Sequence, residues 1–154
     1  MALRMNGHIP SLAGATRWIN GEFSIEEHAG KPIVVHFWSM SCYVCHDVAK
    51  HIAAWRERFS QCGVAFVAIH QPRSPEELDV DKAIADALGP MGFVQSIAID
   101  NDHAIVERFE NHFVPAYYVF DQSHRLRHFQ AGDKGYDRIE AAIERVLEPE
   151  IART

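Results

Sequence analysis

The sequence of 154 residues lacks the features that place a chain in a membrane or on nucleic acid. Its amino-terminal part contains no uninterrupted apolar stretch of about seven residues, the minimum for a secretory signal. No segment has the roughly 20 apolar residues of a membrane-spanning helix. Basic runs are also absent, and 15 Lys and Arg against 21 Asp and Glu give a formal net charge of -6. We therefore expect a cytoplasmic protein without nucleic-acid or membrane partners.

Linkers, internal repeats and low-complexity tracts are also lacking, so residues 1–154 are expected to form a single domain. A hydrophobic content of 47% provides a core large enough to fold without disulfide bonds. Cysteine is scarce, with three residues in the chain. Because cytoplasmic thiols stay reduced, the closely spaced pair Cys42 and Cys45 is more typical of catalysis or metal binding than of a structural disulfide.

Residues 41–46, SCYVCH, allow three interpretations of this pair. They are the dithiol of a thioredoxin-like oxidoreductase, half of a zinc site, or, with His46, the attachment site of a c-type haem. Zinc needs two further ligands, and although His46, His51 and Cys62 have the right chemistry, no second closely spaced pair exists. A β-rich pattern without a signal opposes haem. The dithiol is therefore favoured, and no metal or cofactor is expected.

The hydrophobic pattern alternates strands with helices and predicts an α/β fold, with a mixed central β-sheet flanked by helices. Residues 32–39, PIVVHFWS, indicate a buried strand that ends just before the cysteines. The acidic segment 76–81, EELDVD, is expected to be solvated. Asn20-Gly21 predicts a turn in a small N-terminal hairpin. Further strands are predicted at 64–70, 93–99, 116–121 and 125–130, and helices at 42–59, 81–88, 103–110 and 136–147.

The predicted layout gives the two cysteines different roles. Cys42 starts a helix, where free backbone N–H groups and the helix dipole stabilise a thiolate. Cys45 falls on the same helix face as Val48 and Ile52, so it should be shielded from large substrates. The pattern therefore predicts that Cys42 attacks a substrate disulfide and that Cys45 resolves the mixed disulfide.

Two segments, VVHFWSMSCYVC and FENHFVPAYYVFD, resemble the thioredoxin-fold family, in particular its TlpA/ResA-like branch and the soluble YkuV-type thiol-disulfide oxidoreductases. The resemblance covers nearly the whole chain, with residues 71–99 similar to the helix and strand that this branch inserts. It implies a cis bond between Val114 and Pro115 beside Cys42, where Val114 would pair with an extended substrate peptide and Pro115 would exclude metal. The substrate-binding residues that it implies are Trp38, Tyr43, Val44, Val114 and Pro115.

The sequence also departs from this family. Ser41 replaces the usual Trp before the first cysteine, and no Pro lies between the cysteines. His36, six residues before Cys42, stands where thioredoxin has a buried Asp, and Ala65 stands where the ResA branch has a Glu. The usual acidic proton carrier is thus missing from both places. His36 is either a core residue or the general base that deprotonates Cys45.

The resemblance implies a thiol-disulfide oxidoreductase that reduces disulfide-containing proteins as a monomer. An external electron donor, such as a thioredoxin-reductase-type system, would regenerate its dithiol. The alternative is a redox-sensing binding or chaperone module that does not turn over. A peroxidase is disfavoured, because Ser39-Met40-Ser41 precedes Cys42 where a peroxidatic cysteine has Thr-x-x-Cys. His46 is expected to be solvated, and Cys62 to be buried.

Overall fold

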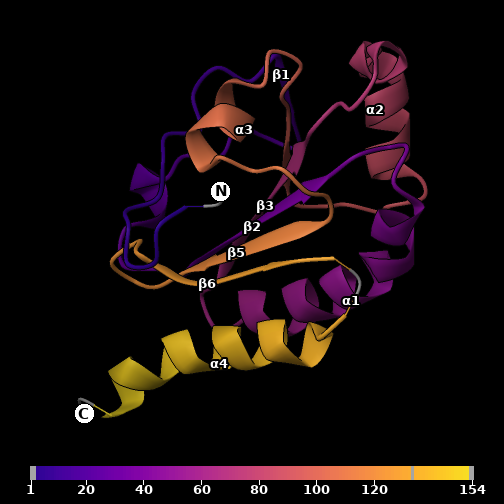
Figure 1. Cartoon of the computed structure of the whole chain (residues 1–154). Helices are drawn as coiled ribbons and strands as arrows, with labels where there is room; N and C mark the ends of the chain where they lie inside the picture. The colour runs from indigo at the N-terminus through magenta and orange to yellow at the C-terminus, as the bar shows by residue number, and fades with distance from the viewer. Residues whose placement is uncertain (1–2, 133, 153–154) are drawn as a thin grey trace.

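The computed structural model describes residues 3–132 and 134–152, without the side chains of Tyr43 and residues 148–152. Helices and strands alternate along the chain, as the hydrophobic pattern predicts (Figure 1). The elements are β1 (Arg17–Ile19), η1 (Glu26–His28), β2 (Ile33–Trp38), α1 (Tyr43–Ser60), β3 (Ala65–His70), η2 (Pro75–Leu78), α2 (Val80–Leu88), β4 (Ser96–Ile99), α3 (Ala104–Phe109), β5 (Ala116–Phe120), β6 (Leu126–Ala131) and α4 (Tyr136–Ala152).

The strands form one mixed six-stranded sheet in the order β1-β4-β3-β2-β5-β6. β2 is parallel to β3 and β3 to β4, whereas β5, β6 and β1 each run antiparallel to their neighbours. The predicted mixed sheet is therefore confirmed. All six residues of β2 are buried, which explains why its sequence is a nearly continuous apolar run.

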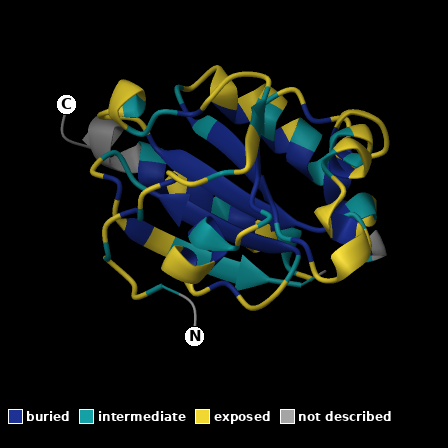
Figure 2. Cartoon of the chain, turned by 90° about the horizontal axis from the view of Figure 1, so that it is seen from above, coloured by how far each residue is buried: buried dark blue, intermediate teal, exposed yellow. Residues whose placement is uncertain are grey.

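Helices cover both faces of the sheet, so the core has two layers. α1 and α4 lie together on one face, and α3 lies on the other face with the N-terminal segment (Figure 1). Side chains along β2 alternate between the layers: Val34 and Trp38 join the cluster under α1, while Val35 and Phe37 join the cluster under α3. Buried residues fill the sheet, and exposed residues gather on the surrounding loops and outer helix faces (Figure 2).

The predicted N-terminal hairpin is wrong. Asn20 and Gly21 both have positive φ angles, 63° and 96°, as a tight turn requires. However, β1 pairs with β4, and the side-chain amide of Asn20 donates to the carbonyl oxygen of Gln95 at 3.1 Å. Phe23, beyond the turn, is buried in the cluster under α3. Pairing with β4 and burial of Phe23 thus replace the second strand of a hairpin.

None of the helices in the described part of the chain is long and apolar enough to cross a membrane.

Candidate active site

The dithiol lies where β2 ends and α1 begins. Cys42 is the N-cap of α1, and its Sγ accepts a hydrogen bond from the backbone N–H of Cys45 at 3.2 Å. A side-chain oxygen usually fills this position, because the first N–H groups of a helix have no partner within the helix. In this protein sulfur takes that place, so the helix start directly stabilises negative charge on Cys42.

The two cysteines differ in access. Both are free thiols, and Cys42 is 7% exposed whereas Cys45 is fully buried. Burial raises the pKa of the Cys45 thiol well above its ordinary value, and the hydrogen bond with Cys42 raises it further. Cys45 is therefore protonated at neutral pH and shielded from a protein substrate. This asymmetry supports the predicted assignment of Cys42 as the attacking thiol.

A pocket opens beside Cys42 on the side of the Val114-Pro115 segment. The Val114-Pro115 peptide bond is cis, and Cys42 Sγ lies 3.8 Å from the carbonyl oxygen of Val114. The pocket has a volume of about 340 Å³ and brings together three of the predicted substrate-binding residues, Val44, Val114 and Pro115. Its lining consists of Ser41, Cys42, Val44, Arg73, Val114, Pro115 and Gly132.

The two aromatic residues of the predicted substrate site have different outcomes. The prediction that Trp38 binds substrate directly is wrong, because its side chain is fully buried. Its ring packs edge-on against Phe93 and His70, and its indole Nε1–H donates to Asp86 at 2.9 Å. Trp38 therefore supports the loop from below. The side chain of Tyr43 lies outside the described part of the structure, so its role stays a prediction.

His36 lies in the sheet, on the side that faces α1. Its ring stacks on Tyr117 with centroids 5.1 Å apart, and neither ring nitrogen has a hydrogen-bond partner among the described residues. Burial lowers the pKa of His36 to about 3, so the imidazole is neutral at physiological pH. Its proposed function as a base for Cys45 stays a prediction.

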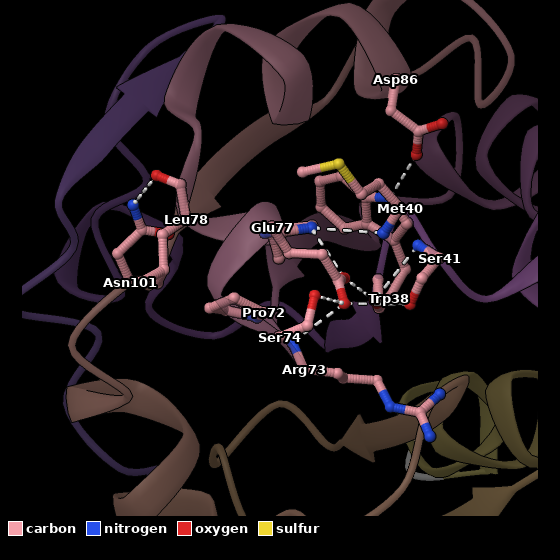
Figure 3. Close-up of polar contacts among 12 residues, drawn as sticks. Trp38, Met40, Ser41, Pro72, Arg73, Ser74, Glu77, Leu78, Asp86 and Asn101 are labelled. Atoms are coloured by element: carbon pink, nitrogen blue, oxygen red, sulfur yellow. Dashed lines mark hydrogen bonds and ion pairs between the residues drawn. The ribbon is translucent and has the colours of Figure 1, made fainter.

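Glu77 is the residue that the sequence analysis missed. The acidic segment that contains it was expected to be solvated, yet Glu77 is 3% exposed. Its carboxylate accepts hydrogen bonds from the hydroxyls of Ser39, Ser41 and Ser74 and from the backbone N–H of Arg73 (Figure 3). Burial alone would raise the pKa of Glu77, but the hydrogen bonds from Ser39, Ser41 and Arg73 hold it below its ordinary value. Glu77 is therefore an anion bound to the loop before Cys42.

A local signal for Glu77 did exist. Ser74 and Glu77 have the three-residue spacing of a capping box, and they flank the start of η2. This spacing predicts a helix start, but it does not reveal that the glutamate points inward.

Asp86 in α2 holds the other side of the dithiol region. Besides accepting from Trp38, it contacts His46 Nε2 at 2.6 Å. The expectation that His46 is solvated is therefore wrong, because its side chain is 26% exposed and paired with Asp86. Glu77 and Asp86 both come from the segment between β3 and β4. This segment thus binds the dithiol region at two points.

Other candidate features lie away from the dithiol. Cys62 is exposed after α1, not buried as expected. In the described residues, no three His, Cys, Asp or Glu side chains gather as metal ligands. A larger cavity of about 630 Å³ includes Val64, Ala65 and Ser96 at the amino ends of β3 and β4, and no cysteine lines it. Since the dithiol lies at the opposite end of the parallel strands, the smaller pocket is the one that serves its chemistry.

These features define the class of the protein. A dithiol that caps a helix after the central strand of such a sheet, with Val114-Pro115 facing it, belongs to the thioredoxin-like thiol-disulfide oxidoreductases. The chain is a member of the AhpC/TSA family, whose model matches residues 7–129. It is 40% identical over 146 residues to the thiol-disulfide oxidoreductase YkuV of Bacillus subtilis (strain 168). The aligned residues cover 94% of this chain and 97% of YkuV.

Further comparisons agree on the fold. The protein DipZ of Mycobacterium bovis (strain ATCC BAA-935 / AF2122/97) is 28% identical over 145 residues, which cover 92% of this chain and 21% of DipZ. The solution structure of a thioredoxin-like protein in the oxidized form has a TM-score of 0.84 at 40% identity and covers 96% of this chain and 99% of that one. A DsbE-type thiol:disulfide interchange protein of Chlorobium tepidum has a TM-score of 0.81 at 15% identity, covering 95% and 99%. The predicted thioredoxin-like fold is confirmed.

Proposed function

We propose that this oxidoreductase reduces disulfide bonds in other proteins, with Cys42 as the attacking thiol and Cys45 as the resolving thiol. The observation that carries this proposal is the asymmetry of the dithiol. Cys42 lines an open pocket and has its Sγ stabilised by the first turn of α1, whereas Cys45 is fully buried behind it.

The reaction has two exchange steps. The Cys42 thiolate attacks one sulfur of the substrate disulfide, the substrate S–S bond breaks, and the released sulfur leaves as a thiolate that takes a proton. Cys45 then loses its proton and attacks Cys42 Sγ, which breaks the mixed disulfide and releases the second substrate thiol. The substrate gains two electrons and two protons, and the protein is left with a Cys42-Cys45 disulfide.

A disulfide at the site must be reduced again before the next turnover. Since a dithiol holds two electrons, an external donor of the thioredoxin-reductase type would have to supply them. We propose that the protein works in the cytoplasm as a monomer. The chain has three cysteines, and the Cys42-Cys45 pair leaves exposed Cys62 without a cysteine partner, which is typical of proteins from a reducing compartment.

Insulin reduction tests the proposal. The purified protein should accelerate precipitation of the insulin B chain by dithiothreitol, because its thiolate reacts faster than the free reagent. Cys42→Ser, which replaces the attacking sulfur with a hydroxyl oxygen, is the matched control and should give the uncatalysed rate. If the wild-type protein does not exceed the rate of Cys42→Ser but does bind unfolded insulin, the chaperone or redox-sensing alternative replaces the proposal.

A further inference from the structure

Arg73 is the charged residue in the lining of the dithiol pocket. Its side chain is exposed, and within the described residues its guanidinium makes no hydrogen bond or ion pair. Figure 3 shows the side chain extending away from the contacts around Glu77. Burial dominates the raised pKa of Cys45, but the charge of Arg73 acts in the opposite direction, which places the guanidinium within electrostatic range of the dithiol.

The backbone of Arg73 is held firmly although its side chain is free. Its N–H donates to Glu77 at 3.2 Å, and the same carboxylate oxygen accepts from the Ser41 hydroxyl at 3.0 Å. On the other side, the carbonyl oxygen of Pro72 contacts His103 Nε2 at 2.9 Å. Arg73 is therefore tied to the residue that precedes Cys42. Its side chain starts from a fixed point at the pocket.

The charges of this loop point in opposite directions. The negative charge of Glu77 faces inward and is occupied by its hydrogen-bond donors. The positive charge of Arg73 faces the pocket. A substrate that approaches Cys42 therefore meets a cation, although the whole chain has a formal net charge of -6.

We propose that Arg73 selects substrate disulfides that have an acidic side chain next to the half-cystine that Cys42 attacks. The planar guanidinium can donate two parallel hydrogen bonds to a carboxylate, which fixes the orientation of the peptide as well as attracting it. This inference rests on the proposed reductase function. It goes further in naming the chemistry of the preferred substrate.

The test uses two disulfide peptides with blocked termini that differ only in Asp or Asn next to the half-cystine. Single-turnover reduction by the pre-reduced protein at low ionic strength gives a rate constant for each. The wild-type protein should prefer the Asp peptide by about three- to fivefold, the upper range for an exposed ion pair. Arg73→Gln should bring this ratio close to one, and salt should reduce the wild-type ratio. Arg73→Lys keeps the charge but loses the planar fork, so its ratio should be intermediate.

Lys31→Gln is the matched control, since Lys31 is exposed and precedes β2, at the end of that strand opposite to the dithiol. It removes the same charge and should keep the wild-type ratio. A wild-type ratio of one, or a ratio that survives in Arg73→Gln, overturns the inference. Equal slowing of both peptides by Arg73→Gln also overturns it, because the residue would then act on the thiolate alone. If the wild-type protein reduces neither peptide, the reductase function itself fails.

Discussion

The dithiol has two unlike surroundings, one from the central sheet and one from the segment between β3 and β4. On the sheet side, His36 and Tyr117 are buried and stacked, and the polar side-chain atoms of both have no partner among the described residues. On the side of the inserted segment, Glu77 and Asp86 each have two or more polar partners. The inserted segment therefore fixes the dithiol loop, whereas the two residues on the sheet side are buried in the core without such contacts.

This difference indicates that the two sides of the dithiol have different roles. Fully bonded buried groups rigidify a site, whereas a buried polar atom without a partner costs about 1 to 3 kcal/mol and calls for an explanation. We infer that Glu77 and Asp86 position the loop, whereas proton transfer from Cys45 to His36 stays a prediction. Three predictions test this contrast between the two sides, beginning with the two cysteines that lie between them.

The largest effect is expected from the two cysteine variants. Cys42→Ser should abolish disulfide reduction, because it removes the thiolate that begins the reaction. Cys45→Ser should still attack once and accumulate a mixed disulfide with the substrate, since only resolution is lost. Non-reducing electrophoresis with a disulfide-bonded substrate distinguishes the two outcomes. Trapping by Cys42→Ser instead would reverse the roles and would make the buried side the reactive one.

The second prediction concerns the side of the inserted segment. Glu77→Ala should lower the free energy of unfolding by about 2 to 3 kcal/mol, because buried donors lose a charged acceptor. The lowered pKa of Glu77 means that its contribution is present above the ordinary carboxyl pKa and is lost as the pH falls through the lowered value. Urea unfolding at pH 7 and at pH 3 should therefore show a smaller difference between variant and wild type at the lower pH.

Glu76→Ala is the matched control, because Glu76 is exposed and adjacent in sequence. It should change stability by less than about 0.5 kcal/mol, as surface substitutions usually do. Equal effects of the two alanine variants would show that the hydrogen bonds to Glu77 do not hold the loop, and the contrast between the two sides of the dithiol would then disappear.

The two sides also differ in how far the sequence could predict them. Periodicity identified β2 and α1, and the position of Cys42 before the apolar helix face predicted its place at the helix start, because both are local properties. The contacts of Glu77 with Ser39 and Ser41, and those of Asp86 with Trp38 and His46, join residues 36 to 48 positions apart. A carboxylate tolerates burial only when distant donors surround it. Local pattern thus indicates a solvated acidic loop, and only the fold reveals a buried anion.

The same limit explains the hairpin and Cys62. The local sequence correctly predicted the turn at Asn20-Gly21. It did not predict that β1 pairs with β4, because β4 lies more than seventy positions away in the chain. Cys62 was expected to be buried from residue type alone. It falls instead in the exposed turn before Gly63, whose φ of 89° reverses the chain after α1.

The smallest effect is expected on the sheet side, from His36→Asn. If His36 takes the proton from Cys45, the variant should slow resolution of the mixed disulfide by about tenfold, at the low end for general-base removal. The low end applies because a base with a pKa of about 3 accepts a proton less readily than one poised near neutral pH. Attack by Cys42 should be nearly unchanged. Stopped-flow measurement of each step across pH 5 to 9 provides the comparison.

The pH dependence separates this role from simple packing. Because the folded-state pKa of His36 is about 3, the residue stays neutral from pH 5 to 9, so the ratio of wild-type to variant resolution rates should be constant over that range. A ratio that falls towards one below pH 6.5 would indicate an imidazole with an ordinary pKa.

The free energy of unfolding supplies an independent check. Because the folded-state pKa of His36 is lowered, the contribution of the neutral imidazole to stability is fully present above about pH 6.5 and is lost as the pH falls towards 3. His36→Asn should lose less stability on acidification than the wild type. A variant with wild-type resolution at every pH, but with this flatter acid profile, would show that His36 has a structural role alone.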